Sequence, residues 1–189
     1  MKVLDVKKVD CPKSVEIYEM RYLEDGKEKV KELLKSLDVV KILIYHREKK
    51  SFVLVKQFRP LVYINRPELS MRYELCGGRE DKSNKSSKEI AMEEVLEETG
   101  YKVSDLVKIT SLATTSKMTL YYAEVDESMK VNDGGGLDYE DIELVYLPVD
   151  DAKEFMFDES KPKRPGLMFA FMWFFATHPS FLNKSFSIR

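Results

Sequence analysis

Cysteine, excess charge and long apolar runs are all scarce in this sequence, and each scarcity excludes a class of protein. The 189 residues include only two cysteines, Cys11 and Cys76, which are far apart and outside any metal-ligand spacing. A disulfide framework or a structural zinc site is therefore not expected, and free thiols suit a reducing compartment. Lys and Arg number 31 against 33 Asp and Glu, so the net charge of -2 offers no basic field for nucleic acid.

The longest apolar run, residues 167–177, has eleven residues. A helix that crosses a bilayer needs roughly 20, so this run predicts a buried helix near the C-terminus and no membrane partner. Residues 1–10 are charged and lack the apolar segment of a secretory signal, which makes the cytoplasm the expected location.

The length suits one full-sized domain with a small appendage at its N-terminus. Alternation at residues 15–22, the turn residues Glu24-Asp25-Gly26-Lys27 and a weaker pattern at 27–34 predict a β-hairpin. A hairpin of this size cannot bury itself, so it must lie on the main domain or on a second copy of the chain. We therefore assign residues 1–36 to a hairpin region and 37–189 to the main domain.

The main domain has the pattern of an α/β protein. One helix is clear, because Ser86 and Glu89 have the spacing of a capping box, apolar spacing follows from Lys88, and Gly100 supplies a stop. A second helix is expected at 165–178. Strand-like runs occur at 39–45, 52–58, 71–76, 107–113, 118–125 and 142–148. This alternation predicts a mixed sheet between helices.

The helix that ends at Gly100 carries an acidic cluster. Glu94, Glu97 and Glu98 fall within an arc of about 100° on one face, and Glu93 stands near its edge. Like charges at this spacing repel, and the helix dipole adds partial negative charge at the same end. A divalent cation would reverse both penalties, and carboxylate oxygens suit Mg²⁺ or Mn²⁺. A solvated acidic face is the alternative interpretation.

Residues 78–101 resemble the Nudix box, whose pattern is Gly, five residues, Glu, seven residues and then Arg-Glu-aliphatic-x-Glu-Glu-x-Gly-aliphatic. The second half matches as Glu93-Glu94-Val95-Leu96-Glu97-Glu98-Thr99-Gly100-Tyr101. The first half departs from the pattern. Gly78 lies one residue early, Lys85 stands at the box glutamate, and Glu93 replaces an arginine that in the family helps to orient the metal-binding carboxylates.

Outside the box, residues 14–175 resemble the ADP-ribose and UDP-glucose pyrophosphatase branch, with the UDP-sugar members the most similar. The resemblance rests on residues 52–60, on Glu74-Leu75-Cys76-Gly77-Gly78 and on Gly134-Gly135-Gly136-Leu137 leading to Glu140. It implies a Nudix fold, an α/β/α sandwich with a mixed sheet, whose N-terminal antiparallel strands pair across a homodimer. Relatives stack a tryptophan on the base near the second of these strands, but the only tryptophan here is Trp173, so the base preference stays open.

The resemblance also implies an activity: magnesium-dependent hydrolysis of the diphosphate of a nucleoside diphosphate sugar, first of all UDP-glucose to UMP and glucose 1-phosphate. ADP-ribose is the second expected substrate, and Mn²⁺ the expected substitute for Mg²⁺. The matching metal ligands are Glu94, Glu97, Glu98 and the backbone carbonyl of Gly77. Glu97 and Glu98 are also the expected catalytic residues.

The same resemblance assigns Glu140, with Asp138 as second choice, as catalytic base or extra metal ligand. The glycines at 134–136 would let its loop close over substrate, and a merely flexible linker is the alternative. Arg59 is expected to contact the diphosphate beside Gly78, with a surface ion pair as the alternative. His46, His178 and Cys76 are interpreted as structural or surface residues.

A competing hypothesis is a catalytically weak or inactive Nudix-fold module that binds a nucleotide. Glu93 and Lys85, which depart from the box, support it. The retained Glu94, Glu97 and Glu98 argue against it, because a pure binder has no need for an electrostatically costly trio.

Overall fold

The structure, a computed structural model, describes residues 17–113, 115–137 and 140–181, and it divides the chain into two units, Met1–Leu37 and Asp38–Arg189. In the first unit β1 (Ile17–Glu24) and β2 (Lys27–Leu34) pair antiparallel. Asp25 and Gly26, between them, have φ angles of 53° and 72°, as a tight hairpin turn requires. The predicted N-terminal hairpin is confirmed. Cys11 and the start of the predicted first strand lie outside the described residues.

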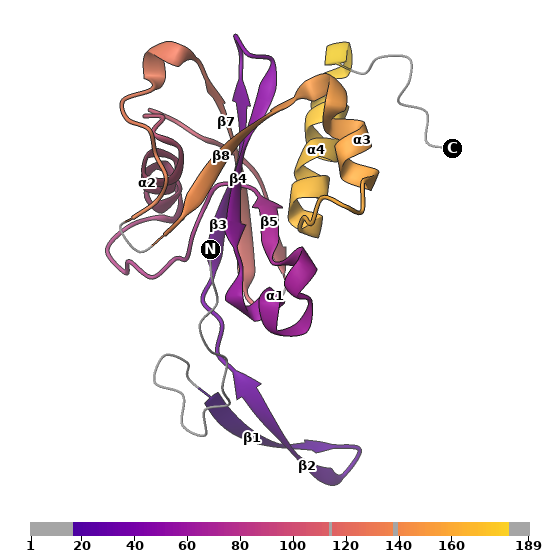
Figure 1. Ribbon diagram of the computed structural model, residues 1–189. Helices are drawn as coiled ribbons and strands as arrows, with labels where there is room; N and C mark the ends of the chain where they lie inside the picture. The colour runs from indigo at the N-terminus through magenta and orange to yellow at the C-terminus, as the bar shows by residue number, and fades with distance from the viewer. Residues whose placement is uncertain (1–16, 114, 138–139, 182–189) are drawn as a thin grey trace. The chain divides into compact units, whose positions relative to one another are not determined.

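The second unit contains a six-stranded sheet in the order β5-β4-β3-β7-β6, with β8 also pairing with β4 (Figure 1). Only β3 and β7 run parallel, so the predicted mixed sheet is confirmed. The strands are β3 (Val39–His46), β4 (Ser51–Phe58), β5 (Met71–Glu74), β6 (Val107–Ala113), β7 (Lys117–Val125) and β8 (Ile142–Pro148). The α-helices are α1 (Pro60–Asn65), α2 (Ser87–Thr99), α3 (Ala152–Phe157) and α4 (Pro165–Thr177). Short 3-10 turns are Pro67–Leu69, Glu127–Met129, Val149–Asp151 and Pro179–Phe181.

Helices cover both faces of the sheet, which gives the predicted α/β/α sandwich. Figure 1 shows α2 on one face and α3 with α4 on the other. Alternate residues of β3 and β4 point into two separate cores, so both strands are apolar along almost their whole length. In one core Phe52 stacks on Phe171 of α4, with ring centroids 4.4 Å apart. The other core contains Ile42 of β3 and Val95 of α2.

The apolar run near the C-terminus is α4, as predicted, and it buries Leu167, Ala170, Phe171, Phe174 and Phe175. Burying each large side chain contributes roughly 1.5–3 kcal/mol. Over the residues that the structure describes, none of the helices combines the length and apolarity that a membrane crossing would need.

The chain after β5 changes partner, and this change positions the candidate site. The predicted strand 71–76 pairs with β4 only as far as Glu74. It then crosses to β3, where the Ile42 amide donates to the Cys76 carbonyl (2.8 Å) and the Val40 amide donates to the Gly78 carbonyl (2.9 Å). At Gly77 φ is 134°, and a Cβ would lie 2.2 Å from the Val40 carbonyl oxygen. Only glycine fits this close approach.

Candidate metal and substrate site

Both ends of α2 are fixed by the residues that predicted them. The Ser86 amide donates to the Glu89 carboxylate (2.7 Å), while the Glu89 amide donates to the Ser86 hydroxyl (3.3 Å), so the capping box is confirmed. Gly100 ends the helix in the left-handed conformation at φ 74°. These caps set the rotation of the helix and therefore the direction of its carboxylates.

Glu94 and Glu98 lie together against the glycine pair. The buried Glu98 carboxylate, 4% exposed, accepts a hydrogen bond from the Gly77 amide at 2.8 Å. Glu94 is held against Gly78, where a Cβ would lie only 2.2 Å from its Oε1. Four of the predicted site residues are therefore brought together by α2 and the segment that follows β5.

The electrostatics of this pair favour a bound cation. Burial, and then the neighbouring Glu98 and Glu97, raise the pKa of Glu94 to about 7. Burial also raises the pKa of Glu98, although Lys41 and the Gly77 amide act in the opposite direction. Two carboxylates are thus held where their charged forms are disfavoured. With the Gly77 carbonyl nearby, these hard oxygen donors fit Mg²⁺ or Mn²⁺. The side chain of Glu97 is 32% exposed, so it lies further out than the buried Glu98.

Glu93, beside the trio, forms ion pairs with two lysines. Lys82 Nζ lies 2.9 Å from its carboxylate, and Lys85 forms a closer ion pair with it. Lys85 and Glu93 are the residues that depart from the Nudix box. Lys85 stands in place of a glutamate and Glu93 in place of an arginine, and the two side chains form an ion pair with each other. The sequence showed both departures, but not that they form a pair.

The glycine loop is tied to the C-terminal end of α2. The Gly135 amide donates to the Glu98 carbonyl (2.9 Å), and the Gly136 amide donates to the Glu97 carbonyl (3.0 Å). These bonds favour an ordered loop over a merely flexible linker. Glu140 accepts from the Leu137 amide at 3.1 Å, and its charge acts on Glu94, Glu98 and Arg59. Asp138, the second choice for the base, lies outside the described residues.

Arg59 forms a buried ion pair in place of the surface pair considered from the sequence. Its Nε and a terminal nitrogen donate to the two oxygens of Glu74 at 2.9 and 2.5 Å, and Glu74 is 1% exposed. Arg164 Nε and Lys41 Nζ lie 3.3 and 3.9 Å from the same carboxylate. Although burial raises the pKa of Glu74, the hydrogen bonds from Arg59 and the nearby charges of Lys41 and Arg164 hold it below its ordinary value.

Three cations around one carboxylate leave a positive excess beside the acidic trio. This is the charge that a diphosphate needs. Sequence reasoning gave no role to Glu74, Lys41 or Arg164. Two of them carry a signal in the sequence: Glu74 belongs to the segment that resembles the family, and Lys41 is the one charged residue inside the apolar run of β3.

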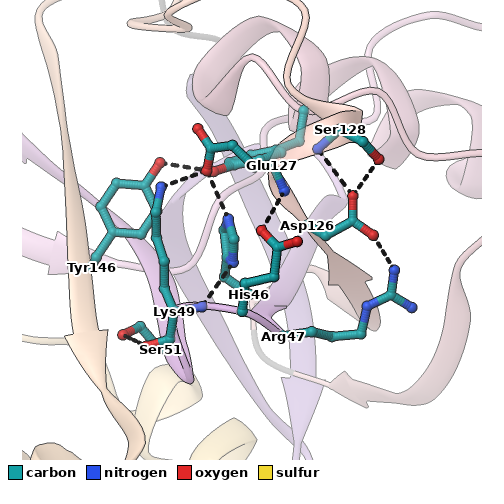
Figure 2. Close-up of polar contacts among 10 residues, drawn as sticks. His46, Arg47, Lys49, Ser51, Asp126, Glu127, Ser128 and Tyr146 are labelled. Carbon is teal, nitrogen blue, oxygen red and sulfur yellow. Dashed lines mark hydrogen bonds and ion pairs between the residues drawn. The ribbon is translucent and has the colours of Figure 1, made fainter.

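A second acidic cluster surrounds His46, at the end of β3 (Figure 2). Ligand atoms of His46, Glu48 and Glu127 all lie within 4.8 Å of one another. His46 is fully buried, and its Nε2 is 3.2 Å from Glu127. Lys49 Nζ lies 2.8 Å from the same carboxylate and 4.2 Å from the centroid of the Tyr146 ring. Because an ammonium already neutralises Glu127, this cluster supports the structural interpretation of His46.

Comparison with known proteins agrees with the geometry. The NUDIX domain family matches residues 35–167. The chain is 36% identical over 191 residues to uridine diphosphate glucose pyrophosphatase NUDT14 of Bos taurus, covering 83% of this chain and 86% of the relative. It is 36% identical over 134 residues to a GDP-mannose pyrophosphatase of Pectobacterium atrosepticum, covering 68% of each.

The fold is matched by a crystal structure of an ADP compounds hydrolase. The TM-score is 0.66 at 19% identity, with 94% of this chain and 95% of that chain covered. The domain match spans most of the chain, and the Bos taurus relative, 36% identical, aligns over 83% of it. The chain therefore belongs to the Nudix hydrolase family.

Proposed function

We propose that this protein hydrolyses the diphosphate bridge of a nucleoside diphosphate sugar, with UDP-glucose as first substrate and ADP-ribose as second. The observation that carries the proposal is the pairing of Glu94 and Glu98 with the Gly77–Gly78 segment, next to the cations around Glu74. The named pyrophosphatase relatives support the substrate class. We further propose that the enzyme is located in the cytoplasm, and cell fractionation would test this location.

Each residue has a distinct task in this scheme. Glu94, Glu97, Glu98 and the Gly77 carbonyl would hold Mg²⁺, which supplies charge neutralisation and a more acidic bound water. Arg59, already oriented by Glu74, would bind the diphosphate oxygens while Gly78 leaves room beside it.

Glu140 would accept a proton from the attacking water. As the water oxygen bonds to one phosphorus, the bridging phosphorus–oxygen bond breaks. The products are a nucleoside monophosphate and a sugar phosphate.

A substrate panel tests the proposal directly. Purified protein would be incubated with UDP-glucose, ADP-ribose, GDP-mannose and a nucleoside triphosphate, with Mg²⁺ or with EDTA, and the products identified by chromatography. We expect cleavage of a diphosphate sugar to two monophosphates only with Mg²⁺. If none of these compounds is cleaved, the binding-module hypothesis is favoured, and equilibrium dialysis with the same compounds would then identify what is bound.

The structure weakens the main support for that binding module. Lys85 and Glu93 were its best argument, since both depart from the Nudix box. The two side chains form an ion pair with each other. The loop and α2 therefore attract each other at these two positions, with the positive charge on the loop and the negative charge on the helix, the reverse of the box pattern. The presence of Lys85 and Glu93 is therefore compatible with catalytic turnover.

We also propose that β1 and β2 form a homodimer contact. Apolar side chains of this hairpin are exposed, including Ile17 (56%), Leu23 (75%) and Leu34 (60%). An isolated two-stranded hairpin is only marginally stable, so a partner surface for these residues is expected. Light scattering should give the mass of a dimer, and Ile17→Lys with Leu34→Lys, a cross-strand pair, should give a monomer. A monomeric wild-type protein would contradict the assignment.

A further inference from the structure

Lys41 is an ammonium placed inside the carboxylate site. It interrupts an apolar strand, and its side chain is only 12% exposed. Its Nζ donates to the Gly77 carbonyl at 2.6 Å and lies 3.3 Å from the Leu75 carbonyl. Removing a charged group from water is unfavourable unless anions and hydrogen bonds replace the solvent. The position therefore requires a nearby negative charge.

Glu74 alone does not account for that charge. Lys41 is 3.9 Å from Glu74, whose oxygens already accept both hydrogen bonds from Arg59 and lie close to Arg164. Glu94 and Glu98 are further anions of the site, and the charge of Lys41 acts on both of them. Lys41 therefore serves the acidic pair on α2 as well as Glu74.

The Gly77 carbonyl is the point of conflict. It is the backbone oxygen expected to bind a divalent cation, and it is also the closest acceptor of the Lys41 ammonium. A carbonyl oxygen has two lone pairs, but two cations that share it repel strongly in a site with little water. Full coordination of a metal by this oxygen and by Glu94 and Glu98 is thus opposed by Lys41.

We propose that Lys41 is a positioning residue that competes with the divalent cation: it holds the Gly77 carbonyl and partly neutralises Glu94 and Glu98 in the metal-free protein, and metal binding displaces its ammonium. This inference rests on the proposed function, because it takes Gly77, Glu94 and Glu98 as the metal ligands. The Lys41 charge should make the metal affinity weaker than it would be without this charge. It should also keep Glu94 and Glu98 close together when no metal is bound.

The test measures the Mn²⁺ Kd of the full chain by calorimetric titration in the absence of substrate. Lys41→Met removes the charge and should lower the Mn²⁺ Kd by about tenfold, and it should lower the melting temperature in EDTA. Lys41→Gln is a second neutral variant for the case in which the first does not fold. Lys41→Arg keeps the charge and should return the Kd towards that of the wild type.

Lys56→Met is the matched control. Lys56 is on the neighbouring strand β4 and is partly exposed, but its ammonium binds Glu143, 2.9 Å away. Its loss should leave the Mn²⁺ Kd unchanged. An unchanged or higher Kd in both neutral Lys41 variants would overturn the competition, even if their KM for a diphosphate sugar rises. If the wild-type protein binds no Mn²⁺ at millimolar concentration, the metal ligands of the proposed function are wrong as well.

Discussion

Gly78→Ala should disable the site without damaging the fold. A Cβ at this position would lie 2.2, 2.5 and 2.7 Å from Glu94 Oε1, Cδ and Oε2, whereas ordinary contacts begin at 3.4 Å. The Glu94 carboxylate must therefore move by at least about 1 Å. It is the far end of a flexible side chain, so it can rotate away without moving the backbone. The displaced group is one of the proposed metal ligands.

The expected losses of rate and of metal affinity follow from the general effect of displacing a group in an active site or a metal site. A 1 Å misplacement of a reacting group can lower a rate by about 100-fold. Disturbing the support of a metal site lowers affinity by about 10- to 100-fold, or roughly 1.4 to 2.8 kcal/mol. Gly78 does not have a positive φ, so alanine restricts the unfolded chain and should stabilise the metal-free protein by up to about 1 kcal/mol.

The assay compares Mn²⁺ calorimetry, the Mg²⁺ dependence of UDP-glucose hydrolysis and the melting temperature in EDTA. Gly166→Ala is the control, because its Cβ meets only the flexible end of Met118 at 3.1 Å in the layer opposite α2 (Figure 1). Gly77→Ala is the contrast, since its Cβ would strike the Val40 backbone and should destabilise the fold. Wild-type metal affinity and turnover in a folded Gly78→Ala protein would refute the assignment of Glu94 as a ligand.

Three further changes test other parts of the site. Glu98→Gln should lower turnover by at least about 100-fold, because even residues that only support a metal ligand contribute 10- to 100-fold; wild-type rates would remove Glu98 from the site. The raised pKa of Glu94, about 7 against 4.5, means that its stabilising effect is complete below pH 4.5 and lost as pH rises through 7. Urea unfolding in EDTA should therefore show stability falling from pH 5 to 8, and Glu94→Gln should reduce that fall. Glu93→Arg should destabilise the protein by about 0.5–1 kcal/mol, since its lysine pairs are partly exposed, and adding Lys85→Glu should restore most of it; no recovery in urea unfolding would mean that the pair is not energetically coupled.

The parts of the fold that the sequence predicted are those with local signals. Helix α2 is predictable because Ser86 and Glu89 mark its start, three residues apart, and Gly100 marks its end. Strands β2, β6 and β8 have their predicted bounds, and the other strands differ from theirs by one or two residues at an end. Helices α1 and α3 were missed because each has only six residues, too few for a clear 3.6-residue period. Helix α3 buries Ala152, Phe155 and Met156, so packing stabilises it, whereas α1 buries none of its residues.

The candidate site also contains residues that local spacing predicts and residues that only tertiary contacts bring together. Glu94, Glu97 and Glu98 are neighbours on one helix, so their spacing alone predicts that they share a face. The contact between Glu74 and Arg164 joins residues ninety positions apart. Lys41 reaches Gly77 only because the chain leaves β4 for β3 after Glu74. No period or motif in the sequence contains that change of partner.

The end of α2 also links the two halves of the site. The last carbonyls of a helix have no partners within it, and here those of Glu97 and Glu98 accept from Gly136 and Gly135. The side chains of the same two glutamates belong to the proposed metal site, while the loop that caps their backbone leads to Glu140. Gly136 has φ 84°, a conformation that other residues rarely adopt, so the loop can turn back onto the helix only with glycine here. A shift of this loop would therefore move the proposed base and strain two proposed metal ligands together, which makes loop position a determinant of both.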